Sequence, residues 1–184
     1  MAANRKNGAD NGTPPADPVD WARHFWRRHQ LGGSEDAFIA MSSVLRFQRL
    51  LVDAVEKELR KHELNITDYM FLMTLQLSET GTRLISHLAR SLLVHATTAT
   101  LATDRLEGRK LIARSPHPTD RRATMVTITK AGRELATAAT ESLRGINFGF
   151  YGNTEEDQRE LTEILARMRR IVGDADTPIK TPRS

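Results

Sequence analysis

The chain has 184 residues, 39% of them hydrophobic, which suffices for one domain with its own core and an attached assembly module. It contains no cysteine, which excludes a disulfide framework, a thiolate metal site and a cysteine redox sensor. The net charge is +4, but between Arg105 and Arg133 eight Lys and Arg residues stand against two carboxylates. This basic segment is either a solvated face or a surface for nucleic acid.

The N-terminal region predicts a tail followed by a short helix. Residues 1–16 are rich in Asn, Gly, Ala and Pro, and we expect them to be disordered. Asp17 followed by Pro18 is the pattern of a helix N-cap with proline in the first turn. This helix carries three aromatic residues and ends near residues 31–33.

A long amphipathic helix comes next. Ser34 is its expected N-cap, and apolar residues then recur at spacings of three and four from Phe38 to Leu59. This stripe predicts a helix to about residue 62. Because a small domain cannot bury a stripe of that length, we expect pairing with a second chain.

The middle of the chain predicts three further helices. The first begins at Thr67 and Asp68 and is ended by the polar residues 78–83. A short helix over residues 84–92 and a longer one over residues 96–109 follow, separated by a tight connection.

After residue 109 the apolar period changes to two. Residues 110–115 and 123–129 predict two strands joined by a proline-containing turn, which makes a β-hairpin with a basic tip. Thr129 is the expected cap of a helix over residues 130–145. After a break, Thr154 begins a final helix with a pattern close to a capping box, and a polar tail covers residues 173–184.

Two short helices, a turn and a basic hairpin are the parts of a winged helix-turn-helix. The expected fold class is therefore mainly α with a small two-stranded β wing. The second short helix starts with small residues, which let its backbone approach the major groove, and its threonines can bond to base edges or touch thymine methyls. Arginines on the narrow hairpin turn can reach the minor groove.

Two segments resemble the MarR family of transcriptional regulators. Residues 88–107 are similar to its helix-turn-helix and residues 118–132 to its wing; the most specific pieces are Asp104-Arg105-Leu106-Glu107 and Asp120-Arg121-Arg122. The resemblance covers about residues 34–172.

The resemblance implies a homodimer that binds a palindromic operator, as a repressor or less often an activator. It implies that residues 17–62 and 130–172 form the dimerisation region and residues 63–129 the DNA-binding lobe. In many relatives a small aromatic or other lipophilic ligand, bound between the two regions, weakens DNA binding.

The helix predicted over residues 96–109 is the recognition helix of the motif, and it and its cap depart from the family pattern at two places. Relatives usually have Ser-Arg where this chain has His95-Ala96, and often Thr-Arg where it has Thr100-Leu101. Each phosphate contact adds nearly one unit to the salt slope of binding. We therefore predict a weaker salt dependence than in a more basic relative, with the wing arginines carrying more of the affinity.

The candidate DNA-binding residues lie on both short helices and on the wing. They are Arg90, Ser91, His95, Thr97, Thr98, Thr100, Arg105, Arg121 and Arg122. Arg121 is the candidate for the groove, while Asp120 orients the wing by a salt bridge with Arg122. Arg105 has a second interpretation, as the intramolecular partner of a carboxylate, and His95 is expected to cap the helix near a phosphate.

An effector pocket is a further hypothesis, with packing as its alternative. Its candidate residues are Trp21, Trp26, Phe47, Tyr69 and Met73.

No nucleophile elbow, phosphate-binding glycine loop or zinc-binding helix is present, so we expect no enzyme activity, cofactor or metal. No apolar run is long enough to cross a membrane, and the N-terminus has no hydrophobic signal-peptide core. We therefore expect a cytoplasmic protein. The alternatives to a regulator are a sequence-tolerant architectural DNA-binding protein and a winged-helix module for protein interaction.

Overall fold

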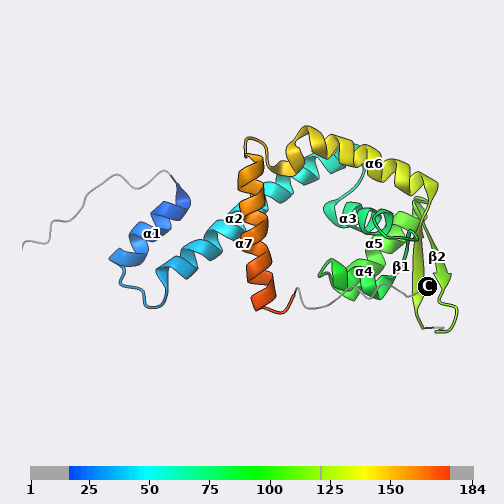
Figure 1. Ribbon diagram of the computed structural model, residues 1–184, viewed down its shortest axis with the longest axis horizontal. Helices are drawn as coiled ribbons and strands as arrows, with labels where there is room; N and C mark the ends of the chain where they lie inside the picture. The colour runs from blue at the N-terminus through cyan, green and yellow to red at the C-terminus, as the bar shows by residue number, and fades with distance from the viewer. Residues whose placement is uncertain (1–16, 121, 175–184) are drawn as a thin grey trace, which may run out of the picture. The chain divides into compact units, whose positions relative to one another are not determined.

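The computed structural model describes residues 17–120 and 122–174, and the chain divides into two compact units between Leu50 and Leu51. The first unit contains helix α1 (Pro18–Arg28) and the N-terminal part of helix α2 (Glu35–Leu59) (Figure 1). The second unit holds the remainder of α2 and all other elements.

The caps expected for the first two helices are confirmed. The carboxylate of Asp17 accepts the N–H of Val19 at 2.6 Å, and the hydroxyl of Ser34 accepts the N–H of Ala37 at 3.2 Å. These bonds satisfy N–H groups that have no partner within their own helix. Both helix starts therefore follow from side chains only two or three residues away.

The start of α2 is tied to α1 by an ion pair. Arg27 Nε lies 2.8 Å from a carboxylate oxygen of Glu35, and the hydrogen bond from Arg27 lowers the pKa of Glu35. A second contact between the two helices joins the rings of Trp26 and Phe38, with their centroids 4.7 Å apart.

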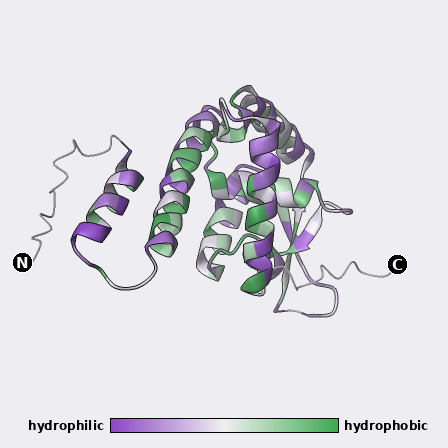
Figure 2. Ribbon diagram, turned by 60° about the vertical axis from the view of Figure 1, so that its left-hand side comes forward, coloured by the Kyte–Doolittle hydropathy of each residue, from purple (hydrophilic) through white to green (hydrophobic). Residues whose placement is uncertain are grey.

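Among the described residues, five helices belong entirely to the second unit. They are α3 (Ile66–Gln76), α4 (Ile85–Ser91), α5 (Ala96–Gly108), α6 (Lys130–Gly145) and α7 (Glu155–Ile171), with short 3-10 turns at Arg60–His62 and Asn147–Gly149. Figure 2 shows hydrophilic and hydrophobic residues mixed along the helices that face the viewer.

The predicted start of α3 needs a correction. The helix begins at Ile66 because Asn65, and neither Thr67 nor Asp68, is its N-cap: the Asn65 side chain accepts the N–H of Asp68 at 2.8 Å. Asn is among the best N-cap residues, so the signal was present in the sequence.

The β-sheet has three strands, whereas the sequence predicted two. Strands β2 (Ile112–Pro116) and β3 (Thr124–Ile128) form the expected hairpin, and β1 (Thr82–Leu84) pairs antiparallel with the other side of β3. Strand β1 thus covers the last two residues of the predicted polar break and the first residue of the predicted short helix, which begins at Ile85. Three residues are too few to show a period of two, and β1 depends on its distant partner, to which Thr82 is also joined by a 2.8 Å hydroxyl bond to Thr127.

The core of the second unit lies between the helices and the sheet. α3 contributes Phe71, Leu72 and Leu75, all fully buried, and α5 and β3 contribute Leu106 and Val126. Val126 and Ile128 are buried on the same face of β3, as the alternation predicted.

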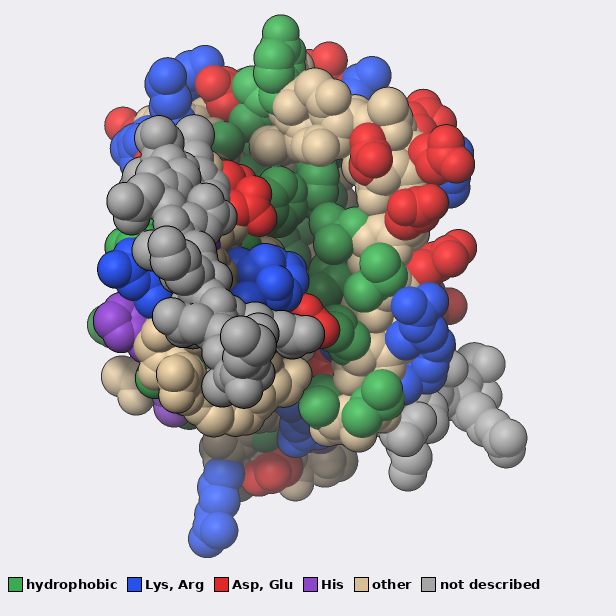
Figure 3. Space-filling view, turned by 90° about the vertical axis from the view of Figure 1, so that its left-hand side faces the viewer, with side chains coloured by type: hydrophobic (Ala, Val, Ile, Leu, Met, Phe, Trp, Pro, Cys, Tyr) green, Lys and Arg blue, Asp and Glu red, His purple; other side chains and the backbone are tan. Residues whose placement is uncertain are grey.

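Helices α6 and α7 have the predicted caps. The hydroxyl of Thr129 accepts the N–H of Gly132 at 3.1 Å, and Thr154 and Asp157 form a complete capping box. α7 has no buried residue among those described, and several of its large apolar side chains are exposed: Ile164, Leu165, Met168 and Ile171. Figure 3 shows exposed apolar side chains among charged ones on the face it presents. In the described part of the chain, no helix combines the length and hydropathy needed to span a membrane.

Candidate nucleic-acid interface

Helices α4 and α5 are joined by a tight turn and buried on one side only. The turn is closed by backbone hydrogen bonds, including that from the N–H of Val94 to the carbonyl of Ala89 at 3.0 Å, and Leu93 takes a left-handed conformation with φ of 51°. The inner face of α5 consists of small or apolar residues with no exposed surface, among them Ala99, Ala102 and Leu106. Because the small residues allow close packing, α5 is held firmly while its other face stays free.

The first turns of α5 carry the three predicted threonines. Thr97 and Thr100 are exposed, and Thr98 is half-buried. His95 occupies the N-cap position, as expected, but its side chain makes no capping hydrogen bond. The side chain of His95 is exposed. It therefore lies at the start of α5 but does not stabilise the helix end by a hydrogen bond.

Arg90 and Ser91 lie at the end of α4, and both are exposed. The fold therefore places two short helices with open surfaces on either side of the turn. Their contact with DNA stays a prediction.

The wing tip is organised by two side chains, one of which sequence reasoning missed. His117 Nδ1 accepts the N–H of Asp120 at 3.2 Å, and the carboxylate of Asp120 accepts the N–H of Arg122 at 3.0 Å. Asp120 therefore orients the wing through the main chain of Arg122, where the sequence had suggested a bond to its guanidinium. The signal for His117 was its position between two prolines in the turn. Arg121 lies outside the described residues.

Arg105 is engaged within the protein. Its guanidinium makes two hydrogen bonds to the buried carboxylate of Asp68 on α3, at 2.7 and 3.2 Å, and the hydrogen bond to Asp68 raises the pKa of Arg105. Of the two interpretations made for Arg105, the structure shows the intramolecular one. It joins the end of the recognition helix to the start of α3.

Two other arginines of the basic segment are also bound to neighbouring groups. Arg109 donates to the carbonyl oxygens of Glu63 and His62 at 2.5 and 3.2 Å. Arg114 on β2 forms ion pairs with Asp104 and Glu107 of α5. Much of the positive charge counted in the sequence is therefore compensated inside the lobe.

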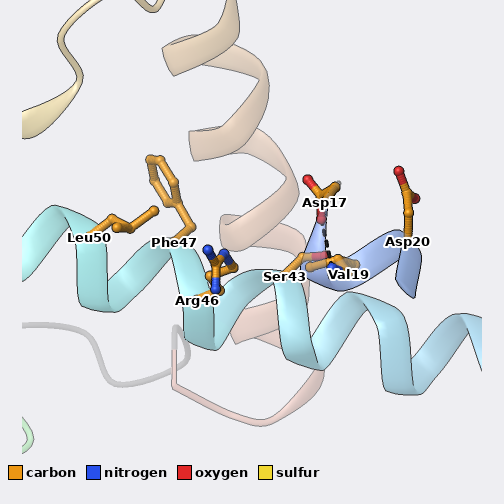
Figure 4. A pocket seen from close by; sticks show the side chains of 7 residues that line it. All are labelled: Asp17, Val19, Asp20, Ser43, Arg46, Phe47 and Leu50. Carbon is orange, nitrogen blue, oxygen red and sulfur yellow. Dashed lines mark hydrogen bonds between the residues drawn. The ribbon is translucent and has the colours of Figure 1, made fainter. Parts of the chain in front are cut away.

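The residues predicted for an effector pocket are divided between the two units, with Trp21, Trp26 and Phe47 in the first and Tyr69 and Met73 in the second. Phe47 lines a hollow of about 340 Å³ in the first unit, together with Asp17, Val19, Asp20, Ser43, Arg46 and Leu50 (Figure 4). Trp21 packs on the ring of Phe25 at 4.6 Å, and Trp26 packs on Phe38 as described above.

In the second unit, Thr140 of α6 contacts both remaining candidates. The hydroxyl of Tyr69 lies 3.0 Å from Thr140 Oγ1, and the sulfur of Met73 lies 3.5 Å from the same atom. Tyr69 is buried. These contacts give both residues a packing role between α3 and α6.

A helix-turn-helix flanked by a three-stranded sheet with a projecting hairpin defines a winged helix-turn-helix protein. The family model described as "MarR family" matches residues 64–124. Sco5413, a MarR family transcriptional regulator from Streptomyces coelicolor, is 31% identical, with a TM-score of 0.72 over 78% of this chain and 99% of that one. The chain therefore belongs to the MarR family of transcriptional regulators.

Other relatives agree with this assignment. The HTH-type transcriptional regulator YhbI of Bacillus subtilis is 27% identical over 72% of this chain and 88% of its own length. Sco3205, a MarR family regulator from Streptomyces coelicolor solved in complex with DNA, shares the fold with a TM-score of 0.65 at 22% identity, over 83% of this chain and 94% of that one.

Proposed function

We propose that the protein is a homodimeric repressor that binds a pseudo-palindromic operator and releases it when a small effector binds. The observation that carries the proposal is the two-sided character of α5, whose inner face is buried and whose outer face is open. A helix held in this way can enter the major groove without losing its packing. Two such helices in a dimer would enter successive grooves, about 34–36 Å apart.

The wing supports DNA binding through a different contact. The hydrogen bonds of His117 and Asp120 shape the turn from which Arg122 projects, and Arg122 is exposed. Positive charge on a narrow hairpin suits the minor groove and its phosphates. Because Arg105, Arg109 and Arg114 are bonded internally, Arg122 and Arg121 are expected to carry a large share of the electrostatic affinity.

Dimerisation is proposed from exposed apolar surface in each unit. The N-terminal part of α2 exposes Met41, Val44, Leu45 and Leu50, and α7 exposes the set named above. Large apolar side chains that recur on one helix face and stay exposed, as those of α7 do, are typical of protein interfaces. We assign residues 17–62 and 130–172 to the dimer region, residues 63–129 to the DNA-binding lobe, and residues 1–16 and 173–184 to tails.

Effector control is proposed as a shift between two spacings of the DNA-binding lobes. An effector can act in this way only if it binds one spacing more tightly than the other. BpsR of Bordetella bronchiseptica, a protein of this fold with 22% identity and a TM-score of 0.63 over 70% of this chain and 97% of that one, is described as regulated in its DNA binding by 6-hydroxynicotinic acid. A thermal-shift screen of aromatic acids tests this part, because a ligand selective for the folded state raises the melting temperature.

A footprinting experiment on the region upstream of the protein's own gene tests operator binding. We expect protection of one operator-length segment that survives excess random competitor DNA. Equal affinity for random DNA would favour an architectural protein, and no binding to any genomic site would favour a protein-interaction module; either result would overturn the proposal. An Arg121→Ala/Arg122→Ala double variant is expected to lose much of the affinity, with little change in melting temperature.

A further inference from the structure

The outer face of the recognition helix has an apolar residue at its centre. Leu101 is 53% exposed, although leucine is a residue that folded proteins usually bury. Thr97 and Asp104 lie four residues before and three after it, so the three side chains share one face of α5. Thr100, beside Leu101, is also exposed.

The hydrogen-bonding groups of this helix are largely occupied. The Thr100 hydroxyl donates to the carbonyl of Ala96 at 3.0 Å. In this arrangement it has no second proton with which to donate a hydrogen bond to a DNA base. Asp104 is paired with Arg114, and Arg105 holds Asp68 with two bonds.

The side chains that recognise bases by paired hydrogen bonds are Arg and Lys for guanine and Asn and Gln for adenine. Helix α5 contains none of these except Arg105, which is already bonded. Its outer face therefore cannot make the usual two-bond contacts. Besides the hydroxyl of Thr97, it offers the isobutyl group of Leu101 with the methyl groups of Thr97 and Thr100.

The major groove presents one matching group, the C5-methyl of thymine. We infer that α5 recognises its half-site chiefly by packing Leu101, with Thr97 and Thr100, against thymine methyl groups. The inference rests on the proposed function, since it needs α5 in the major groove. DNA fits this face better than a protein does, because Arg114 pairs with the Asp104 carboxylate that would otherwise repel phosphates, and because Arg90 on α4 and Arg122 on the wing are exposed.

The test compares thymine with deoxyuridine, which differs only in lacking the C5-methyl. Duplexes are first selected from a randomised library with the full-length protein and then synthesised with deoxyuridine at single thymine positions. We expect at least one position in each half-site at which affinity, measured by fluorescence anisotropy at fixed salt, falls about fourfold for the missing methyl. Substitution in both half-sites of a palindrome should reduce it by about the square of that factor.

The variant Leu101→Ala tests whether the loss of affinity on removal of the thymine methyl depends on Leu101. The variant should bind the thymine duplex several-fold more weakly and should no longer distinguish thymine from deoxyuridine at the sensitive position. Leu77→Ala is the matched control, since Leu77 is an exposed leucine at the end of α3, outside the helix-turn-helix. It should preserve both affinity and discrimination.

The possible failures can be told apart. If the library yields no enriched sequence, the proposed function itself is wrong and this inference falls with it. If a sequence is enriched but no deoxyuridine substitution weakens binding, only the inference is overturned. Retained discrimination in a folded Leu101→Ala variant would overturn it equally. The deoxyuridine series with the unmodified protein decides the question even if Leu101→Ala fails to fold.

Discussion

The ion pair between Arg105 and Asp68 allows a test that separates structural support from DNA contact. Asp68 is 4% exposed, while the Arg105 side chain keeps 46% of its surface in solvent. The two partners are therefore not equivalent. Arg105→Met leaves a buried carboxylate without its cation, whereas Asp68→Asn leaves a guanidinium that water can reach.

The expected losses of stability differ accordingly. Removing one partner of a fully buried pair costs about 3 to 5 kcal/mol; because Arg105 is half-exposed, we expect about 2 to 3 kcal/mol for Arg105→Met. Asp68→Asn keeps an oxygen acceptor at the same place, so the loss should be about 1 kcal/mol. In a chain of this size, a loss of 2 to 3 kcal/mol lowers the melting temperature by about 4 to 12 °C.

The assays are thermal unfolding of both variants and operator binding at several salt concentrations. If Arg105 serves only to position α5 on α3, both variants weaken DNA binding and neither changes the salt slope. If Arg105 instead binds a phosphate, the slope should fall by about 0.9 for each phosphate that is no longer neutralised, in Arg105→Met alone. A reduced slope combined with an unchanged melting temperature in Arg105→Met would refute the structural assignment.

Three other substitutions test separate parts of the structure. Gly132→Ala places a methyl group against the carbonyl of Leu111 and should destabilise the protein by about 1 to 3 kcal/mol in chemical denaturation; an unchanged midpoint would contradict this packing. Met168→Glu puts a charge on the exposed face of α7 and should weaken the proposed dimer about tenfold or more in analytical ultracentrifugation. If the unsubstituted protein is already a monomer, the assignment of α7 to a dimer interface is wrong. Thr154→Ala removes the hydroxyl bond that is the larger of the two causes lowering the pKa of Asp157 and keeps the backbone N–H bond, so that pKa should rise part of the way in an NMR titration. Because Asp157 has the lower pKa in the folded state, its contribution to stability is present above its ordinary pKa and is lost as the pH falls through the lowered value, and the variant should lose the larger part of this acid dependence.

Much of this protein follows from short stretches of its sequence. Asp17, Thr129 and Thr154 were recognised as caps because each accepts hydrogen bonds from residues two or three positions ahead. The alternation that buries Val126 and Ile128 is equally local. The winged helix-turn-helix was recognised in the same way, since its parts follow each other along the chain. Caps and strand alternation depend on residues only a few positions apart, so they can be recognised from the sequence.

The tertiary structure alone decided the interactions between distant residues. Strand β1 exists because Thr82–Leu84 meet β3, more than forty positions later in the chain. Arg105 was an equal candidate for DNA and for a carboxylate until folding placed Asp68 beside it, 37 residues away. A guanidinium binds whichever anion the fold brings close to it. The distance between Arg105 and Asp68 in space cannot be read from their positions in the sequence. The same holds for the outer face of α5. Its residue types are visible in the sequence, but only the fold shows that Asp104 and Arg105 are bound by partners from β2 and α3 while Leu101 stays exposed.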